Sequence, residues 1–316
     1  MLIAVKNRIE GETMTRSWTQ SNKVEKPRDT IYALRKHQTD NNRQDPYEKN
    51  SQKMAELARN YHENLQKDGI DPDRTLRDQC TEEALAALQR RVNVEQRNLL
   101  RGIITEEDVE EALQNSQNLK SPGMNGITYE LWKHIHQEYK KNPEKFNIIK
   151  LMTEYFNDIQ KYGISETSDF SIGWMCPIYK KNDRNEIENY RPITIVNTDY
   201  KILTKVLALR LAKVAPSLLH KSQAGFVPGW SIAEQTKLIE MMIDYAEVSE
   251  QNGLIVALDQ EKAYDKIAHD YLWKVLATFE FPEEFIKLIK ALYQNAETSI
   301  MINGHLSSTF KVTRGV

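Results

Sequence analysis

A run of apolar residues near the end of the chain constrains the fold more than any other feature. Gly253 opens the run LIVAL, and Asp259 closes it. An uninterrupted apolar run of this length is typical of a strand that is buried on both faces, in a sheet covered by helices. Ligands commonly lie at the carboxyl ends of such strands. The run therefore predicts a covered sheet with the Asp259 carboxylate at the end of one strand.

Helical patterns occupy most of the chain before this run. Apolar residues recur at three- and four-residue steps from Ser51, and Thr81 and Thr105 stand before acidic residues as helix N-caps do. Further helices are expected over 127–139, 146–162, 200–219, 233–248 and 263–279. Gly163 should end the second of these and Pro216 the third. Strands are expected within 170–183 and 253–259 and in a hairpin around Asn303-Gly304. Helices come first and strands mix in later, which predicts an α+β fold.

Charge and cysteine content exclude several classes of protein. The formal net charge is −2, but the stretch from Trp174 to Lys213 holds eight Lys or Arg and four Asp or Glu. Such a patch either holds a phosphate backbone or is an ordinary solvated surface. Cys80 and Cys176 lie far apart, which argues against a disulfide scaffold and fits a reducing compartment. We expect a soluble intracellular protein with no membrane partner, because the sequence shows neither a signal peptide nor an apolar run of roughly 20 residues.

Two residues of the segment LDQEKAYD are candidates for chemistry, and each has a plainer interpretation. Asp259 is placed to hold Mg²⁺, a hard ion that takes oxygen ligands, or simply to cap the turn that follows. Tyr264 is placed to form the base of a nucleotide pocket and to clash with a 2′-hydroxyl. It also belongs to an apolar helical stripe with Ile267, Tyr271 and Val275, which favours ordinary packing.

Four segments together resemble the reverse transcriptases of non-LTR (LINE-type) retrotransposons. LDQEKAYDKI resembles the first catalytic motif of that family. LKSPGMNGITYELWK resembles its upstream block, the segment from CPIYKKND to ALRL its fingers block, and SQAGFVPGWSIAEQ the block that follows the fingers. The four occur in family order over residues 119–316. Trp230 and Asn125 depart from the pattern, which has Arg and Asp at those places.

The resemblance implies a fold and a domain organisation. It implies part of a right-hand polymerase, the fingers and the first part of the palm, over residues 119–316. Residues 51–118 would be a helical linker region, and the polar, irregular composition of residues 1–50 predicts a largely disordered arm.

The resemblance also implies a site. In the complete family, two Mg²⁺ ions promote nucleotidyl transfer to a DNA primer on an RNA template, with deoxynucleoside triphosphates as substrates. Asp259 would bind both ions with help from the carbonyl of Gln260, and Tyr264 would favour deoxynucleotides. The remaining implied contacts are to triphosphate, from Arg191, Lys180 and Lys181, and to template or nucleotide, from Gln223, Gly225 and Phe226.

One element of the family pattern is missing from the sequence. No two adjacent aspartates occur in the chain, and the family carries such a pair on a later turn of the palm. The resemblance therefore implies an N-terminal fragment that is inactive alone, or alternatively a non-catalytic relic or co-opted module that binds RNA or an RNA–DNA hybrid. The strand ending at Asp259 would have an unpaired edge, so we also expect oligomerisation or aggregation.

Overall fold

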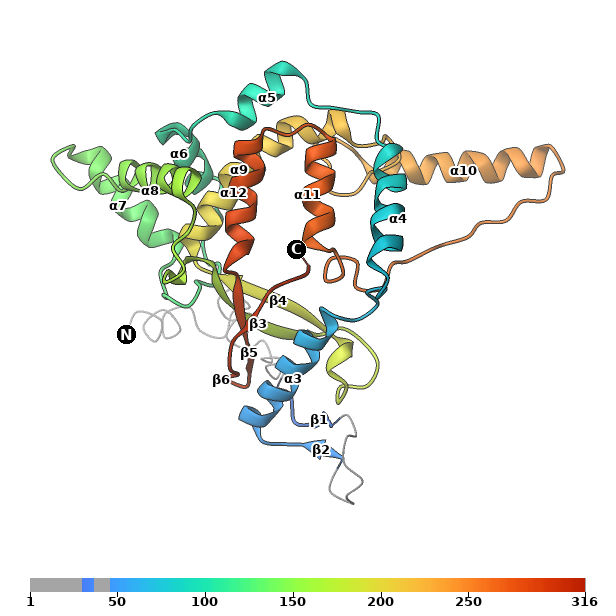
Figure 1. Ribbon diagram of the computed structural model, residues 1–316, viewed down its shortest axis with the longest axis horizontal. Coiled ribbons are helices and arrows are strands. Elements are labelled where there is room, and N and C mark those ends of the chain that lie inside the picture. The colour runs from blue at the N-terminus through green and yellow to red at the C-terminus, as the bar shows by residue number, and fades with distance from the viewer. Residues whose placement is uncertain (1–29, 37–45, 316) are drawn as a thin grey trace, which may run out of the picture.

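The computed structural model of the chain describes residues 30–36 and 46–315 (Figure 1). Most of the expected disordered arm lies outside these ranges. Helices surround one central sheet in the described part of the chain, so the α+β class is confirmed.

The sheet is built around β3 (Ile172–Tyr179), which pairs antiparallel with β4 (Tyr190–Val196) and parallel with β5 (Glu297–Ile302). β5 also pairs antiparallel with two short strands, β6 (His305–Leu306) and β7 (Phe310–Lys311). The expected hairpin around Asn303-Gly304 is confirmed as the β5–β6 connection, and both loop residues have positive φ, as tight two-residue hairpins require. A separate two-stranded ribbon joins β1 (Leu34–Arg35) to β2 (Tyr47–Glu48).

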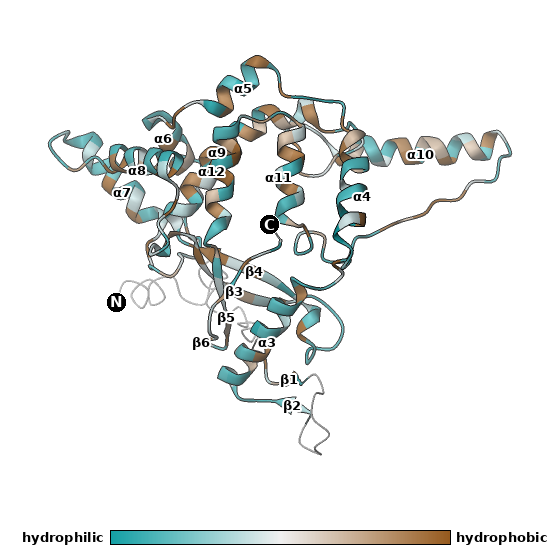
Figure 2. Ribbon diagram, viewed as in Figure 1, coloured by the Kyte–Doolittle hydropathy of each residue, from teal (hydrophilic) through white to brown (hydrophobic). Residues whose placement is uncertain are grey.

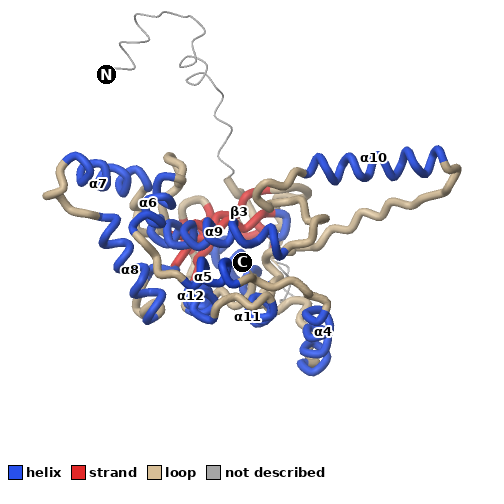
Figure 3. The backbone as a smooth tube through the Cα atoms, turned by 90° about the horizontal axis from the view of Figure 1, so that it is seen from above, coloured by secondary structure: helices blue, strands red, loops and turns tan. Residues whose placement is uncertain are grey.

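The helices of the described residues lie mainly around the central sheet (Figures 1 and 3). They are α3 (Ser51–Leu65), α4 (Arg74–Ala86), α5 (Val94–Arg101), α6 (Glu106–Gln114), α7 (Tyr129–Lys141), α8 (Ile148–Tyr162), α9 (Thr198–Leu218), α10 (Ile232–Val248), α11 (His269–Thr278) and α12 (Glu283–Gln294). Gly163 ends α8 with φ 83°, as predicted. Pro216 lies inside α9, so the prediction that it ends this helix is two residues short.

Two groups of buried side chains hold the helices and sheet together. The larger joins α5, α6, α8, α9 and α12, with Phe156 and Leu203 fully buried at its centre. The smaller lies between α3 and the sheet and includes Met54 and Ile300. The larger core contains side chains from both sides of residue 118, where a domain division was expected, and that division stays a prediction.

A buried cation joins the helices before residue 118 to α9. The guanidinium of Arg210 donates to the carbonyls of Gly102 (2.5 Å) and Ile103 (2.7 Å) and to the Asp108 carboxylate (2.6 Å). These contacts satisfy a charge that would otherwise be costly to bury. They fix the connection between α5 and α6 against α9.

The apolar run that predicted a buried strand does not form one. Residues 251–260 have no regular secondary structure, and Leu254 and Leu258 are 88% and 92% exposed. A strand needs a neighbour to satisfy its backbone and cover its side chains, and no other described strand pairs with this run. α10 and the run extend together away from the rest of the molecule (Figures 1 and 3). The prediction of a covered strand at 253–259 is therefore wrong for this structure.

Candidate functional site

The turn after the exposed run carries the candidate catalytic residues. Asp259 and Gln260 lie at its exposed start, and Tyr264 is 63% exposed. Residues 261–266 form turns, and α11 begins at His269. The packing interpretation of Tyr264 therefore fails in this structure, because its ring lies largely in solvent.

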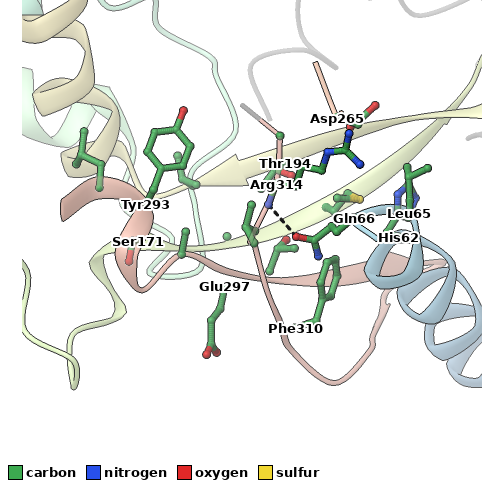
Figure 4. Close-up of a pocket in the computed structure, with 18 of the residues that line it drawn as sticks. His62, Leu65, Gln66, Ser171, Thr194, Asp265, Tyr293, Glu297, Phe310 and Arg314 are labelled. Atoms are coloured by element: carbon green, nitrogen blue, oxygen red, sulfur yellow. Dashed lines mark hydrogen bonds between the residues drawn. The ribbon is translucent and has the colours of Figure 1, made fainter. Parts of the chain in front are cut away.

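This turn contributes one residue to a cavity of about 250 Å³ between α3, the sheet and α12 (Figure 4). Asp265 lines the cavity, and burial raises the pKa of its carboxyl above the ordinary value, against the opposing charge of Lys262. His62 lines the same cavity, and burial lowers the pKa of its imidazole to about 4. The nearby charge of Lys262 lowers the pKa of His62 further. Burial therefore disfavours the charged form of both groups.

The expected triphosphate contacts lie on the β3–β4 hairpin. Lys180 and Lys181 follow β3, Arg191 is near the start of β4, and all three are exposed. Among the described residues none of the three forms an ion pair. Arg191 lies opposite Ile178 in the strand register, so both side chains share one face of the hairpin. The hairpin therefore presents three cations to solvent.

The strand alternation separates Arg191 from the Asp265 cavity. Thr194 lines that cavity from β4. Arg191 stands three positions earlier on the same strand, so its side chain leaves the opposite face. Arg191 therefore does not face the cavity that Asp265 lines.

The weaker candidates lie in the loop between α9 and α10. Gln223 donates through Nε2 to the carbonyl of Gly225 (3.2 Å), which stabilises the loop locally. Phe226 is 99% exposed and has a φ of 62°. A fully exposed phenylalanine has no packing role here, which leaves its ring free to stack on a flat partner such as a base.

The upstream block docks onto the start of α9. The backbone N–H of Asn125 donates to Asn197 Oδ1 (3.2 Å), and the Trp132 indole donates to Thr198 Oγ1 (2.9 Å). Gly123 lies so close that a Cβ there would stand 2.2 Å from Asn197 Oδ1 and 2.4 Å from the Asn197 backbone nitrogen. Only glycine fits that approach, which explains how the upstream block and the fingers block form one unit.

The described residues do not by themselves fit a two-ion metal centre. Within 30–36 and 46–315 no three His, Cys, Asp or Glu side chains are grouped to hold a metal ion. Asp259 is a suitable oxygen ligand for a hard cation and lies on an exposed segment. It can supply one carboxylate to such a centre.

Sequence reasoning missed the residues that hold this turn in place. Gln66, at the end of α3, bonds the segment 311–314, and Arg314 donates through Nε to the carbonyl of Lys266 (2.7 Å). No sequence signal marks these contacts, because they join polar side chains to backbone groups some 50 to 250 positions away. In the described part of the chain, no helix combines the length and apolarity needed to cross a membrane.

The sequence is similar to known reverse transcriptase and transposon proteins. Residues 178–316 match the family described as reverse transcriptase (RNA-dependent DNA polymerase). The chain is 29% identical over 269 residues to the Transposon TX1 uncharacterized 149 kDa protein of Xenopus laevis, covering 83% of this chain and 19% of that protein.

Two R2 retrotransposon proteins are also similar. The type-2 retrotransposable element R2DM polyprotein of Drosophila melanogaster is 25% identical over 41% of this chain and 12% of its own length. The type-1 element R2 polyprotein of Popillia japonica is 26% identical over 44% of this chain and 19% of its own length. The chain thus spans about a fifth or less of these relatives. Residues 178–316 are thus similar to a reverse transcriptase domain, and the chain is similar to proteins of transposon TX1 and of R2 retrotransposable elements.

Proposed function

We propose that this chain carries the fingers and the first part of the palm of an RNA-directed DNA polymerase, and that it grips an RNA–DNA hybrid and an incoming nucleotide. The observation that carries the proposal is the β3–β4 hairpin of the reverse transcriptase domain. Its cations Lys180, Lys181 and Arg191 are exposed and form no ion pair with a described residue. Cations left without protein partners are suited to phosphate groups.

The turn at 259–264 would receive the nucleotide. Asp259 would supply a carboxylate for a divalent ion, with the Gln260 carbonyl beside it. Tyr264, with its ring largely in solvent, would meet the sugar and disfavour a 2′-hydroxyl. Gln223, Gly225 and Phe226 would face the template or the nucleotide.

Catalysis by two metal ions needs several carboxylates gathered at one point, and the described residues hold no such group. We therefore propose that the 316-residue chain binds a hybrid without extending the primer, and that polymerisation uses additional palm residues. A purely RNA-binding or hybrid-binding role is the alternative. It is favoured because the described residues hold no group of three metal-ligating side chains, and a binding module needs none.

The hairpin cations are tested by binding at several salt concentrations. Replacing Lys180, Lys181 and Arg191 together by glutamine should make the plot of log affinity against log salt less steep by about 2 to 3, because each phosphate contact contributes roughly 0.7 to 0.9 to that slope. Fluorescence anisotropy with a labelled RNA–DNA hybrid measures the slope.

The control removes the same charge elsewhere. Lys161 on α8 and Lys287 and Lys290 on α12 are exposed lysines outside the hairpin. Their triple glutamine variant should keep the parent slope. Equal slopes for both variants, or no binding by the parent chain, would refute the proposed grip. Binding with extension only after additional palm residues are joined to the chain supports the polymerase over the binding module.

Self-association is a second expected property of the chain. α10 and the run 254–258 both carry hydrophobic residues (Figure 2), and Met242, Val248 and Leu254 are each more than half exposed. Exposed hydrophobic patches promote association. Size-exclusion chromatography with light scattering should show oligomers or aggregates. Replacing Leu254 and Leu258 by glutamate should shift the chain toward monomer, whereas Leu131→Glu, at an exposed leucine of α7, should not. A monodisperse parent monomer would contradict this expectation.

A further inference from the structure

Helix α3 and the residues just after it contact the turn that carries Tyr264. The ammonium of Lys262 donates to the Tyr61 hydroxyl and lies 4.7 Å from the centroid of the Tyr61 ring. Farther along the turn, the Lys266 ammonium lies 3.2 Å from the Asp68 carboxylate. Two side chains of this region therefore hold the two lysines that flank Tyr264.

Gln66 links the same region to the segment 311–315. Its Nε2 donates to the Lys311 carbonyl (3.0 Å). Its Oε1 accepts from the backbone N–H of Thr313 (2.5 Å), from the Thr313 hydroxyl (2.9 Å) and from the backbone N–H of Arg314 (3.1 Å). One amide thus fixes the backbone at positions 311, 313 and 314, and Figure 4 shows the bond between Gln66 and Arg314 at the edge of the cavity.

The segment 311–315, which Gln66 holds, also bonds the turn that carries Tyr264. Arg314 donates to the carbonyls of Lys266 (2.7 Å) and Asp68 (2.6 Å). The backbone N–H of Gly315 donates to the Ile267 carbonyl (2.8 Å). Gly315 has a φ of 93°, and a Cβ there would lie 3.2 Å from the Asp265 backbone, so the two segments are in close contact.

Few contacts lie within the turn, and one of them is the Lys266 ammonium 3.4 Å from the exposed Glu261 carboxylate. Lys266 N–H donates to the Lys262 carbonyl (3.1 Å), and Lys262 adopts a φ of 48°, which lysine rarely does. The run before the turn is exposed and makes no strand. The shape of the turn is therefore imposed by groups outside it.

We propose that Gln66, with Tyr61 and Asp68, positions the 262–268 turn and so orients Tyr264 toward the nucleotide sugar. The contact of Tyr264 with a nucleotide sugar rests on the proposed function. The positioning does not, because it is a property of the folded chain. Gln66 touches no reacting group and is a positioning residue that acts through Arg314 and Gly315.

Hydrogen–deuterium exchange of the 316-residue chain, followed by mass spectrometry, tests the positioning without any ligand. Gln66→Met keeps the length of the side chain and removes its hydrogen bonds. It should speed exchange in a peptide covering 262–269 on the order of tenfold, because the turn then opens locally. Gln66→Glu keeps the acceptor oxygen and should exchange near the parent rate.

Gln52 offers a matched control on the same helix. It donates to the Leu306 carbonyl (2.7 Å) at the other end of α3. Gln52→Met should leave exchange over 262–269 unchanged. Equal acceleration in the two methionine variants would mean that α3 merely undocks, and no acceleration in Gln66→Met would mean that the turn holds itself; either result overturns the proposal. Tyr61→Phe, a milder change, should give a smaller acceleration and serves if Gln66→Met fails to fold.

The experiment separates this inference from the proposed function. Faster exchange in Gln66→Met from a chain that binds no hybrid would uphold the positioning and refute the function. Hybrid binding by the parent chain, with no change in exchange in Gln66→Met, would uphold the function and refute the positioning.

Discussion

Asp259→Asn should lower the rate of primer extension on the order of a thousandfold in a polymerase completed by joining this chain to the remaining palm and thumb of a related retrotransposon protein. The substitution preserves the shape of the side chain and removes its negative charge. A neutral amide is a poor ligand for a hard divalent ion, and Asp259 is the carboxylate that the proposed function assigns to that ion. Single-turnover extension of a labelled primer on an RNA template measures the rate.

The same experiment needs a control at an aspartate with no assigned role. Asp244 is exposed on α10, so Asp244→Asn makes the same chemical change away from the turn. It should extend the primer at the parent rate. Hybrid affinity should be unchanged in both variants, since neither removes a hairpin cation. If Asp259→Asn extends as fast as the parent, the assignment of Asp259 is wrong.

The elements predicted correctly from sequence are those with local signals. Thr105 caps α6 and forms a capping box with Asp108, as its place before acidic residues indicated. Gly163 ends α8 in a conformation that glycine adopts readily. The Asn303-Gly304 hairpin depends on two adjacent residues. Each of these signals operates within a few residues, so no knowledge of the remaining fold was needed.

The wrong predictions show where local signals compete or are not enough. Thr81 was expected to begin a helix, but Asp73 accepts hydrogen bonds from the first turn and starts α4 eight residues earlier. The strand at 253–259 failed for a different reason. Its composition favours a strand, yet a strand forms only beside a partner, and partner choice depends on residues distant in the chain.

The candidate site was predictable only in part. Asp259, Tyr264 and the hairpin cations were found from a family pattern, which names residues but not their contacts. The groups that hold the turn could not be found in this way. Gln66 and Arg314 are 248 positions apart, and their contact uses a backbone N–H that every non-proline residue possesses. Such contacts leave no trace in the composition of either segment.

Acid should destabilise the chain through His62, at the edge of the cavity beside the turn. Burial, with a smaller effect of the Lys262 charge, lowers the pKa of this imidazole from 6.5 to about 4 in the folded chain. Well above pH 6.5 the imidazole is neutral in both the folded and the unfolded chain, so His62 does not reduce the free energy of unfolding. Between pH 6.5 and 4 the unfolded chain takes up a proton that the folded chain does not, so the free energy of unfolding should fall by about 1.4 kcal/mol per pH unit, or about 3 kcal/mol in all.

Urea unfolding between pH 7.5 and 4, followed by tryptophan fluorescence, measures this loss. His62→Leu removes the titrating group and should reduce the pH dependence by about 3 kcal/mol over that range. His134→Leu, at an exposed histidine of α7, should leave it unchanged. Equal pH dependence in the parent and in His62→Leu, or an NMR titration of His62 with a midpoint near 6.5, would show that water reaches this imidazole. Because His62 and Asp265 line the same cavity, such a result would also mean that the space behind the turn is open to solvent.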